Sequence, residues 1–161
     1  MGIKITLKKT TNKKAMQTLQ NLKDGIVKVG FWGDRKEPNG LSVVENAFMQ
    51  EHGFFINNSV YVPPRPFMQI TMNENKAKWA KNWKKLYKSV LDGKRTFKQA
   101  LDLLGYIVKR DLQETLLTSK KIRKNKESTL AIKREKGSPQ KPLLDSLAMY
   151  YSIQIASMEK R

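Results

Sequence analysis

The residues best suited to chemistry lie in the stretch 51-EHGFFINNSVYVPPRPFM-68, which holds the only histidine of the chain. An imidazole can act as a general base or bind zinc, but the first role needs a nucleophile and an orienting group, and the second needs further ligands. His52 has only Glu51 beside it, and the chain has no cysteine. We therefore expect no catalytic residue, no metal site and no cofactor. His52 is expected to cap the end of a helix, near the negative end of the helix dipole.

Other enzyme signatures are also missing from the sequence. Gly30, Gly33 and Gly40 do not have the spacing of a nucleotide-binding loop, and the carboxylates are scattered along the chain. We do not expect an enzyme.

The segment Pro63-Pro-Arg-Pro66 resembles a proline-rich peptide ligand. It is short, however, and the large apolar residues on both sides indicate that it is buried and not displayed. The interpretation that we prefer is a rigid connection, in which the Arg65 guanidinium makes a fixed ion pair or fork contact.

The charge is strongly positive, with 32 Lys and Arg against 14 Asp and Glu, a net charge of +18. Such a field attracts polyanions and says nothing about the fold. The densest basic cluster is an excursion over 119–142 that is poor in apolar residues, so we expect it to be peripheral and to become ordered on docking to neighbouring proteins. Our candidates for facing DNA or phosphate are cations of this excursion, namely Lys120, Lys121, Arg123, Lys124, Lys126, Lys133, Arg134 and Lys136.

These contacts would go to backbone phosphates, because the chain has no base-reading motif. A second lysine-rich stripe lies on the helix predicted from Phe67, and we expect that stripe to be a solvated helix face. Trp79 and Trp83 lie on the opposite, apolar face, so they are expected in the core and not as base-stacking platforms.

The elements that must position these residues follow from periodicity. Strands are predicted at 3–9 and 26–33, and a short helix within 12–22. A helix over 42–53 begins with a capping box of Ser42 and Glu45 and ends at Gly53. An extended segment then runs to Pro66, because prolines exclude helix there.

The second half of the chain is predicted to be mostly helical. Long helices over 67–91 and from Thr96 to about Leu116 form an antiparallel hairpin. A short helix after Ser128 and a helical turn follow, and a closing strand has Tyr151, Ile153 and Ile155 on alternate positions. We expect one α+β domain over 1–161, with a small, mostly antiparallel sheet packed against helices and a basic extended loop.

Several of these segments together resemble the small neck or tail-completion proteins of tailed bacteriophages. The matching phrases are 29-VGFWGD-34, 42-SVVENAFMQEHG-53, 62-VPPRPFM-68 heading a long helix, and the ending 141-KPLLDSLAMYYSIQIAS-157. Ser146 stands where the family often has Thr-Gly. The resemblance spans roughly residues 26–157, and it makes an interface motif of His52, Gly53, Pro64, Arg65, Pro66 and Phe67.

The resemblance implies a structural virion protein at the head–tail junction, present in the host cytoplasm during assembly. Its expected partners are further copies of itself in a six-fold or twelve-fold ring, a connector or adaptor, a stopper, a tail terminator, and packaged DNA in the lumen, with no membrane partner. The alternative is a basic nucleic-acid-binding module without sequence preference. The start of the chain lacks the apolar run of a signal peptide, and no run is long enough to span a membrane.

Overall fold

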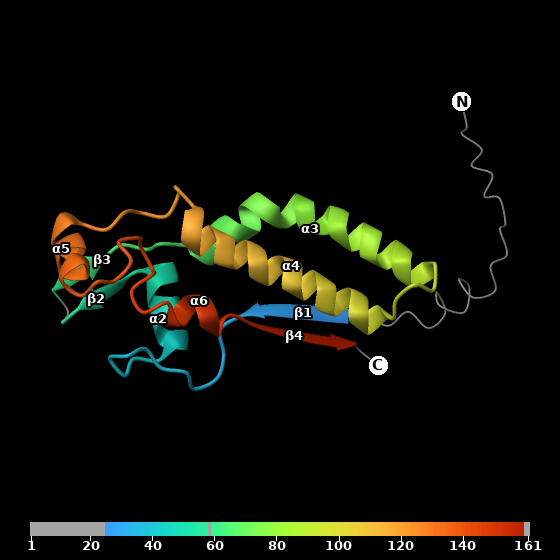
Figure 1. Cartoon of the computed structure of the whole chain (residues 1–161), viewed down its shortest axis with the longest axis horizontal. Coiled ribbons are helices and arrows are strands. Elements are labelled where there is room, and N and C mark those ends of the chain that lie inside the picture. The colour runs from blue at the N-terminus through green and yellow to red at the C-terminus, as the bar shows by residue number, and fades with distance from the viewer. Residues whose placement is uncertain (1–24, 58, 160–161) are drawn as a thin grey trace, which may run out of the picture.

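A computed structural model describes residues 25–57 and 59–159 of the chain. The strand expected at 3–9 and the helix expected within 12–22 lie outside these residues. The described part is built around two long helices, α3 (Phe67–Leu91) and α4 (Phe97–Thr118), which run antiparallel along the molecule (Figure 1). The predicted helical hairpin is thus confirmed.

Local chemistry explains where the hairpin turns. Gly93 has a φ of 72°, which glycine adopts without strain. Thr96 then caps α4 through a reciprocal pair of hydrogen bonds. The backbone amide of Gln99 donates to the Thr96 hydroxyl at 3.2 Å, and the backbone amide of Thr96 donates to the Gln99 side-chain oxygen at 2.9 Å. Both helices present an apolar face to each other, which is the main source of stability for helices of this kind.

A buried carboxylate fixes the register between the two helices. Asp111 on α4 is 1% exposed. It accepts from the Lys78 ammonium at 2.7 Å and from the Trp79 indole nitrogen at 2.8 Å, both on α3. Trp79 therefore lies on the packed face, as predicted, and its polar atom is satisfied there.

One side of α4 is covered by a two-stranded antiparallel sheet, β1 (Gly25–Gly30) and β4 (Gln154–Glu159). The strands pair from Gly25 opposite Glu159 to Gly30 opposite Gln154. The sheet approaches the helix closely at Gly105, where a Cβ would overlap the Ile155 side chain and lie 3.3 Å from Val27. A glycine inside a helix is unfavourable, so this close approach is the reason for it.

The remaining elements gather at the end of the molecule away from the α3–α4 turn (Figure 1). They are the helices α2 (Val43–His52), α5 (Glu127–Glu135) and α6 (Ala148–Ser152), and a hairpin of β2 (Phe54–Ile56) and β3 (Val60–Val62). Phe67 is fully buried at their centre and meets Phe31 edge-on, with ring centroids 6.0 Å apart. The core around it consists of Val43, Ala47, Leu112, Leu116, Ile122, Leu144, Met149 and Ile153.

The α+β class is confirmed, and several details differ from the predictions. The described strands form two separate two-stranded sheets, and the segment expected to be merely extended contains the β2–β3 hairpin. Tyr151 belongs to α6 and not to the closing strand, because Met149, Ser152 and Ile153 become buried together at helical spacing. Ser42 begins α2, but its side chain makes no capping hydrogen bond. The short helix predicted after Ser128 is α5.

The basic excursion is more integrated into the fold than expected. Ile122 is 5% exposed and belongs to the core cluster. The expectation that 119–142 is peripheral is therefore wrong for this part of the segment. No helix among the described residues is both long enough and apolar enough to cross a membrane.

The change Gly105→Ala tests the contact between α4 and the sheet. Alanine gains up to about 1 kcal/mol of helix propensity, but its methyl group must displace Ile155, and overpacking of this kind costs roughly 1–3 kcal/mol. We expect a net loss of about 1 kcal/mol in urea unfolding. Ile155→Ala should relieve the overlap, so the double variant should lose less than the two single losses added together. Simple additivity would contradict the close packing.

Candidate interaction site around Arg65

The Arg65 side chain joins three segments that are far apart in the sequence. Its Nη1 donates to Gln50 Oε1 on α2 at 3.0 Å, its Nε donates to the Arg123 carbonyl at 3.1 Å, and its Nη2 donates to Asn125 Oδ1 at 3.3 Å. Only a planar guanidinium can reach acceptors in this fork arrangement. The fixed fork contact predicted from the proline context is present, and its acceptors are neutral oxygens.

Arg65 is partly withdrawn from solvent, and this affects its charge. Burial lowers the pKa of Arg65, and the nearby positive Arg123 lowers it further. The group stays cationic at neutral pH because its ordinary pKa is very high. Its position is therefore held by hydrogen bonds in spite of a charge that burial disfavours.

The backbone around Arg65 is fixed independently of the side chain. The Arg65 backbone amide donates to the backbone carbonyl of Gln50, in the last turn of α2, at 2.6 Å. Gly53 ends α2 with a φ of 81°, as predicted, and a Cβ there would lie 2.9 Å from the Val62 carbonyl of β3. Prolines on both sides restrict the remaining freedom of the chain. The side chain therefore starts from a rigid base.

The start of α3 is capped by a residue of α2. The Glu51 carboxylate accepts from the Met68 amide at 2.9 Å and from the Gln69 amide at 3.0 Å. A carboxylate is favourable there because the first amides of a helix are unpaired and carry partial positive charge. Pro66 stands at the N-cap position of α3, but its side chain has no polar atom and makes no capping hydrogen bond.

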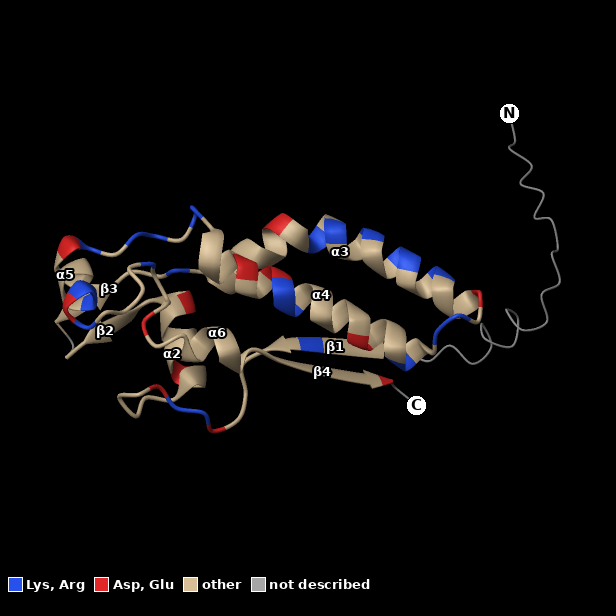
Figure 2. Ribbon diagram, viewed as in Figure 1, with Lys and Arg blue, Asp and Glu red and all other residues tan. Residues whose placement is uncertain are grey.

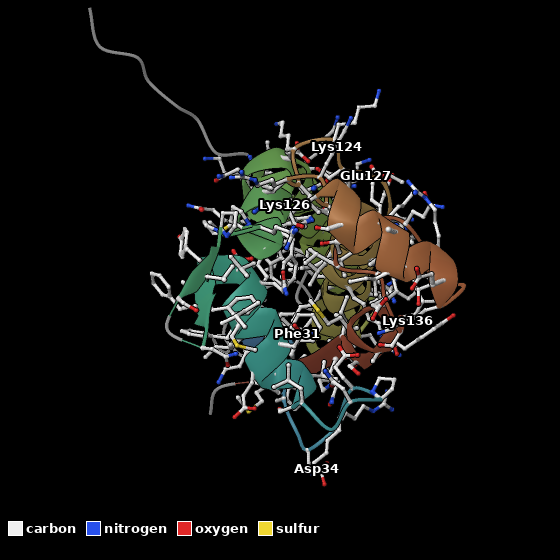
Figure 3. All side chains as sticks on the ribbon, turned by 90° about the vertical axis from the view of Figure 1, so that its left-hand side faces the viewer. Phe31, Asp34, Lys124, Lys126, Glu127 and Lys136 are labelled. Atoms are coloured by element: carbon white, nitrogen blue, oxygen red, sulfur yellow. The ribbon has the colours of Figure 1, made fainter. Side chains whose placement is uncertain are left out.

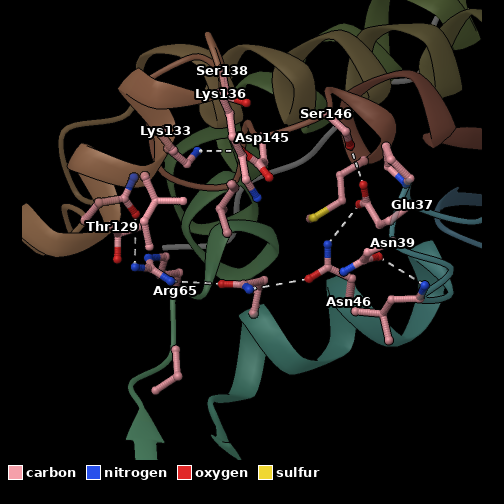
Figure 4. A pocket seen from close by; sticks show the side chains of 18 residues that line it. Glu37, Asn39, Asn46, Arg65, Thr129, Lys133, Lys136, Ser138, Asp145 and Ser146 are labelled. Atoms are coloured by element: carbon pink, nitrogen blue, oxygen red, sulfur yellow. Dashed lines mark hydrogen bonds and ion pairs between the residues drawn. The ribbon is translucent and has the colours of Figure 1, made fainter.

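A continuous polar network runs from Arg65 across α2 to the C-terminal loop (Figure 4). The side-chain amide of Gln50 donates to Asn46 Oδ1 at 3.4 Å, and the side-chain amide of Asn46 donates to Glu37 Oε1 at 2.9 Å. The Ser146 hydroxyl donates to the other oxygen of Glu37. Each polar side chain along this line has a partner, so the network can hold the surrounding loops in one arrangement.

A second cation, Lys133 of α5, organises the loop before α6. Its ammonium donates to the carbonyls of Pro139, Lys141 and Leu144 at 3.0, 2.9 and 3.0 Å. The side chain is almost completely buried, and Asp145 lies 3.9 Å away. Burial lowers the pKa of Lys133, partly offset by Asp145 and reinforced by Arg65. All three N–H groups of the ammonium are used inside the protein.

These residues line an open cleft of about 610 Å³ between α2, α5 and the loop before α6 (Figure 4). Its walls mix polar side chains such as Asn46 and Asp145 with apolar ones such as Leu143 and Met149. Two of the three cations in its wall, Arg65 and Lys133, already have partners inside the protein, and the third, Lys136, is exposed. It is a polar junction between segments.

The structure separates the predicted phosphate-facing residues into three groups: one is enclosed, two are paired at the surface and five are exposed. Lys133 was expected to face phosphate, and this is wrong, because its ammonium is enclosed by backbone carbonyls. Two others are engaged at the surface: Lys121 pairs with Glu74 at 2.7 Å, and Arg134 pairs with Glu127 at 2.5 Å. The remaining candidates are exposed: Lys120, Arg123, Lys124, Lys126 and Lys136.

The residues of the predicted interface motif lie together at the start of α3, and they differ in exposure. Phe67 is in the core, Arg65 is at the polar junction, and Pro64 is exposed. His52 stays at the surface. Its Nδ1 lies 3.0 Å from the Phe48 carbonyl and its ring stacks on the Phe48 ring, which agrees with the expected role at a helix end.

Sequence reasoning missed Gln50, Glu51 and Asn125 as partners in this site. Gln50 contacts a residue 15 positions away, Glu51 contacts residues 17 and 18 positions away, and Asn125 contacts a residue 60 positions away. No local sequence spacing indicates contacts of this kind. For metals, the residues that the structure describes contain no group of three or more His, Asp or Glu side chains that could hold an ion.

Replacing Arg65 should destabilise the protein more than replacing an exposed arginine. Arg65→Ala removes three hydrogen bonds and leaves partly buried oxygens without donors, at a cost of roughly 2–4 kcal/mol. Arg65→Lys should recover only part of this loss, because an ammonium cannot span the three acceptors. The control is Arg95→Ala in the exposed α3–α4 turn. Equal unfolding free energies for Arg65→Ala and Arg95→Ala, measured in urea, would refute the role of the fork.

Lys133→Met tests the buried ammonium, and its matched control is Lys136→Met, at an exposed position directly after α5. Three carbonyls lose their donor in the first variant, so we expect a loss of roughly 2–3 kcal/mol. Amide hydrogen exchange over residues 138–146 should also become faster. A Lys133→Met protein that exchanges and melts like Lys136→Met would show that the ammonium does not hold this loop.

No protein-family model, curated protein sequence or solved structure matches this chain. The inference of function therefore rests on the residues and surfaces described above.

Proposed function

We propose that the chain is a structural virion protein of a tailed phage, a subunit of a ring in the neck at the head–tail junction, around the DNA channel. The observation that carries this proposal is the apolar surface of the β2–β3 hairpin. The sequence resemblance at the Val-Pro-Pro-Arg-Pro-Phe segment, which leads directly out of β3, supports it.

The hairpin exposes large apolar side chains on both of its faces. Phe55 pairs with Tyr61 and they are 62% and 51% exposed, while Ile56 pairs with Val60 on the other face and they are 46% and 54% exposed. The hairpin lies at one edge of the molecule (Figure 3). An isolated two-stranded hairpin is marginally stable in water, and its open edges favour pairing with another chain.

A repeated subunit contact is the simplest use of such a surface. In a ring each subunit presents one patch to its neighbour and receives a different one, so an exposed hairpin at one edge suits a side-to-side interface. The rigid connection through Arg65 would then hold the hairpin at a fixed angle to α3. A closed ring requires the same rotation at every head-to-tail contact, so a hairpin held at one angle suits it.

A basic nucleic-acid-binding module without sequence preference is the second candidate, and the exposed lysines favour it. Such a module needs no apolar interface and would bind DNA as a monomer. The hairpin surface is what makes the ring the better proposal.

Paired substitutions test the hairpin as the assembly surface. Phe55→Ser with Tyr61→Ser removes the larger apolar pair, and Tyr106→Ser with Tyr151→Ser removes two aromatics elsewhere that are each 64% exposed. The hairpin variant should stay folded and remain monomeric in light scattering, while the control and the unchanged chain should both form a ring in negative-stain microscopy.

The proposal fails if the unchanged chain is monomeric at all salt concentrations, with and without DNA. It also fails if the hairpin variant assembles as well as the control does. Cryo-EM of the parent virion gives the direct check, because density for this fold is expected at the head–tail junction.

A further inference from the structure

The α3 helix carries a concentrated positive surface. Between positions 75 and 91 the sequence has six lysines and no aspartate or glutamate. Four of them, Lys81, Lys84, Lys85 and Lys88, are all exposed, and we call these four the lysine ridge. Figure 2 shows the basic residues along the side of α3 that faces away from α4.

Helical geometry places the ridge on one narrow face. At about 100° per residue, these four positions fall within an arc of about 100°, opposite the side of Trp79, Trp83 and Val90. Trp83 packs against Phe97 of α4 with ring centroids 5.9 Å apart, and Val90 is buried. The apolar face is thus already covered, and the lysine ridge is free to meet a partner.

Among the residues that the structure describes, the ridge lysines have no carboxylate partner, in contrast to several other cations of the chain. Lys78, on the same helix, is paired with the buried Asp111. In the 119–136 segment Lys121 and Arg134 are paired and Lys133 is buried. Within the described residues, none of the ion pairs involves a ridge lysine.

The ridge is also preorganised. Its lysines are mounted on a 25-residue helix, whereas Lys120 to Lys126 lie in a connection without regular structure. The helix therefore presents its four charges at regular intervals along one straight face, which the irregular connection does not.

The chemistry of the ridge fits duplex phosphates. From position 81 to 88 the helix rises about 10 Å, and a duplex presents one phosphate charge per ~1.7 Å of its axis, so several phosphates lie within that length. Lysine offers a point charge without base-specific geometry. A membrane is a poorer fit, because a surface-bound helix inserts its apolar face and that of α3 is packed on α4.

We propose that the lysine ridge of α3, and not the 119–136 segment, is the surface that contacts the phosphate backbone of duplex DNA. The placement of this surface toward a channel rests on the proposed ring. A subunit that has not assembled should also bind duplex DNA through the ridge.

The experiment compares two fourfold variants of the full chain with equal charge loss. The ridge variant carries Lys81→Gln, Lys84→Gln, Lys85→Gln and Lys88→Gln. The control carries Lys120→Gln, Lys124→Gln, Lys126→Gln and Lys136→Gln, all exposed in the fold. Glutamine has nearly the helix propensity of lysine, so both proteins should fold. Circular dichroism and melting check this.

Binding to a 30-bp duplex of random sequence is measured by fluorescence anisotropy between 50 and 300 mM KCl. Each lost phosphate contact lowers the slope of log K against log salt by about 0.9, so the ridge variant should lose roughly 3 units of slope and the control less than 1. If the ridge variant fails to fold, the pairs Lys81/Lys85 and Lys84/Lys88 are changed separately, and each should remove about half of that slope.

The proposal is overturned if the control loses as much slope as the ridge variant, or if the ridge variant keeps the slope of the unchanged chain. It is also overturned if vesicles with 30% phosphatidylserine show the ridge-dependent binding and the duplex does not. Ring formation by the ridge variant, followed separately by microscopy, distinguishes failure of the DNA contact from failure of the proposed neck function.

Discussion

The fork of hydrogen bonds from Arg65 is the interaction on which the rest of this end of the molecule depends. It ties the end of α2, the lead-in to α3 and the segment after α4 to a single planar group. A partly buried guanidinium without a carboxylate partner is unfavourable by itself, because burial disfavours its charge. Its use here is positional. Several flexible segments acquire one arrangement relative to the long helices, and the β2–β3 hairpin is held at the same junction.

Lys133 repeats this use of a cation as a scaffold. Its ammonium satisfies three carbonyls of a loop that has no regular hydrogen-bonding partners of its own. The net charge of +18 therefore overstates what the surface offers to a polyanion. Some cations are internal supports and others are neutralised by neighbours. In the described part of the chain, exposed cations without a carboxylate partner remain in the connection after α4 and on the lysine ridge of α3, and on the ridge a regular helix displays them along one face.

Much of the architecture could be predicted from the sequence, because it follows from local rules. Helical periodicity and the cap at Thr96 predict the α3–α4 hairpin. The prolines that flank Arg65 indicate that its guanidinium makes a fixed fork contact. The rest depends on distant partners. In the sequence, Lys133 cannot be told from its exposed neighbours, because the groups that accept its hydrogen bonds are backbone carbonyls and not side chains. The β2–β3 hairpin turns near Asn57, whose positive φ of 50° asparagine tolerates, but its strands of three residues each are too short for alternation to reveal them. Alternation misplaced Tyr151, because three buried positions at helical spacing outweighed it.

The two proposed surfaces lie on different elements, and their separation has a thermodynamic consequence. Association through the hairpin brings strongly positive subunits together, which electrostatic repulsion opposes. Phosphates bound along the lysine ridge neutralise part of that charge, so bound DNA lowers the repulsion between neighbours. Linkage requires the reverse as well: assembled subunits must bind DNA more tightly than separate ones by the same factor. On these proposals, the excess of lysine would make ring formation depend on the polyanion that the ring encloses.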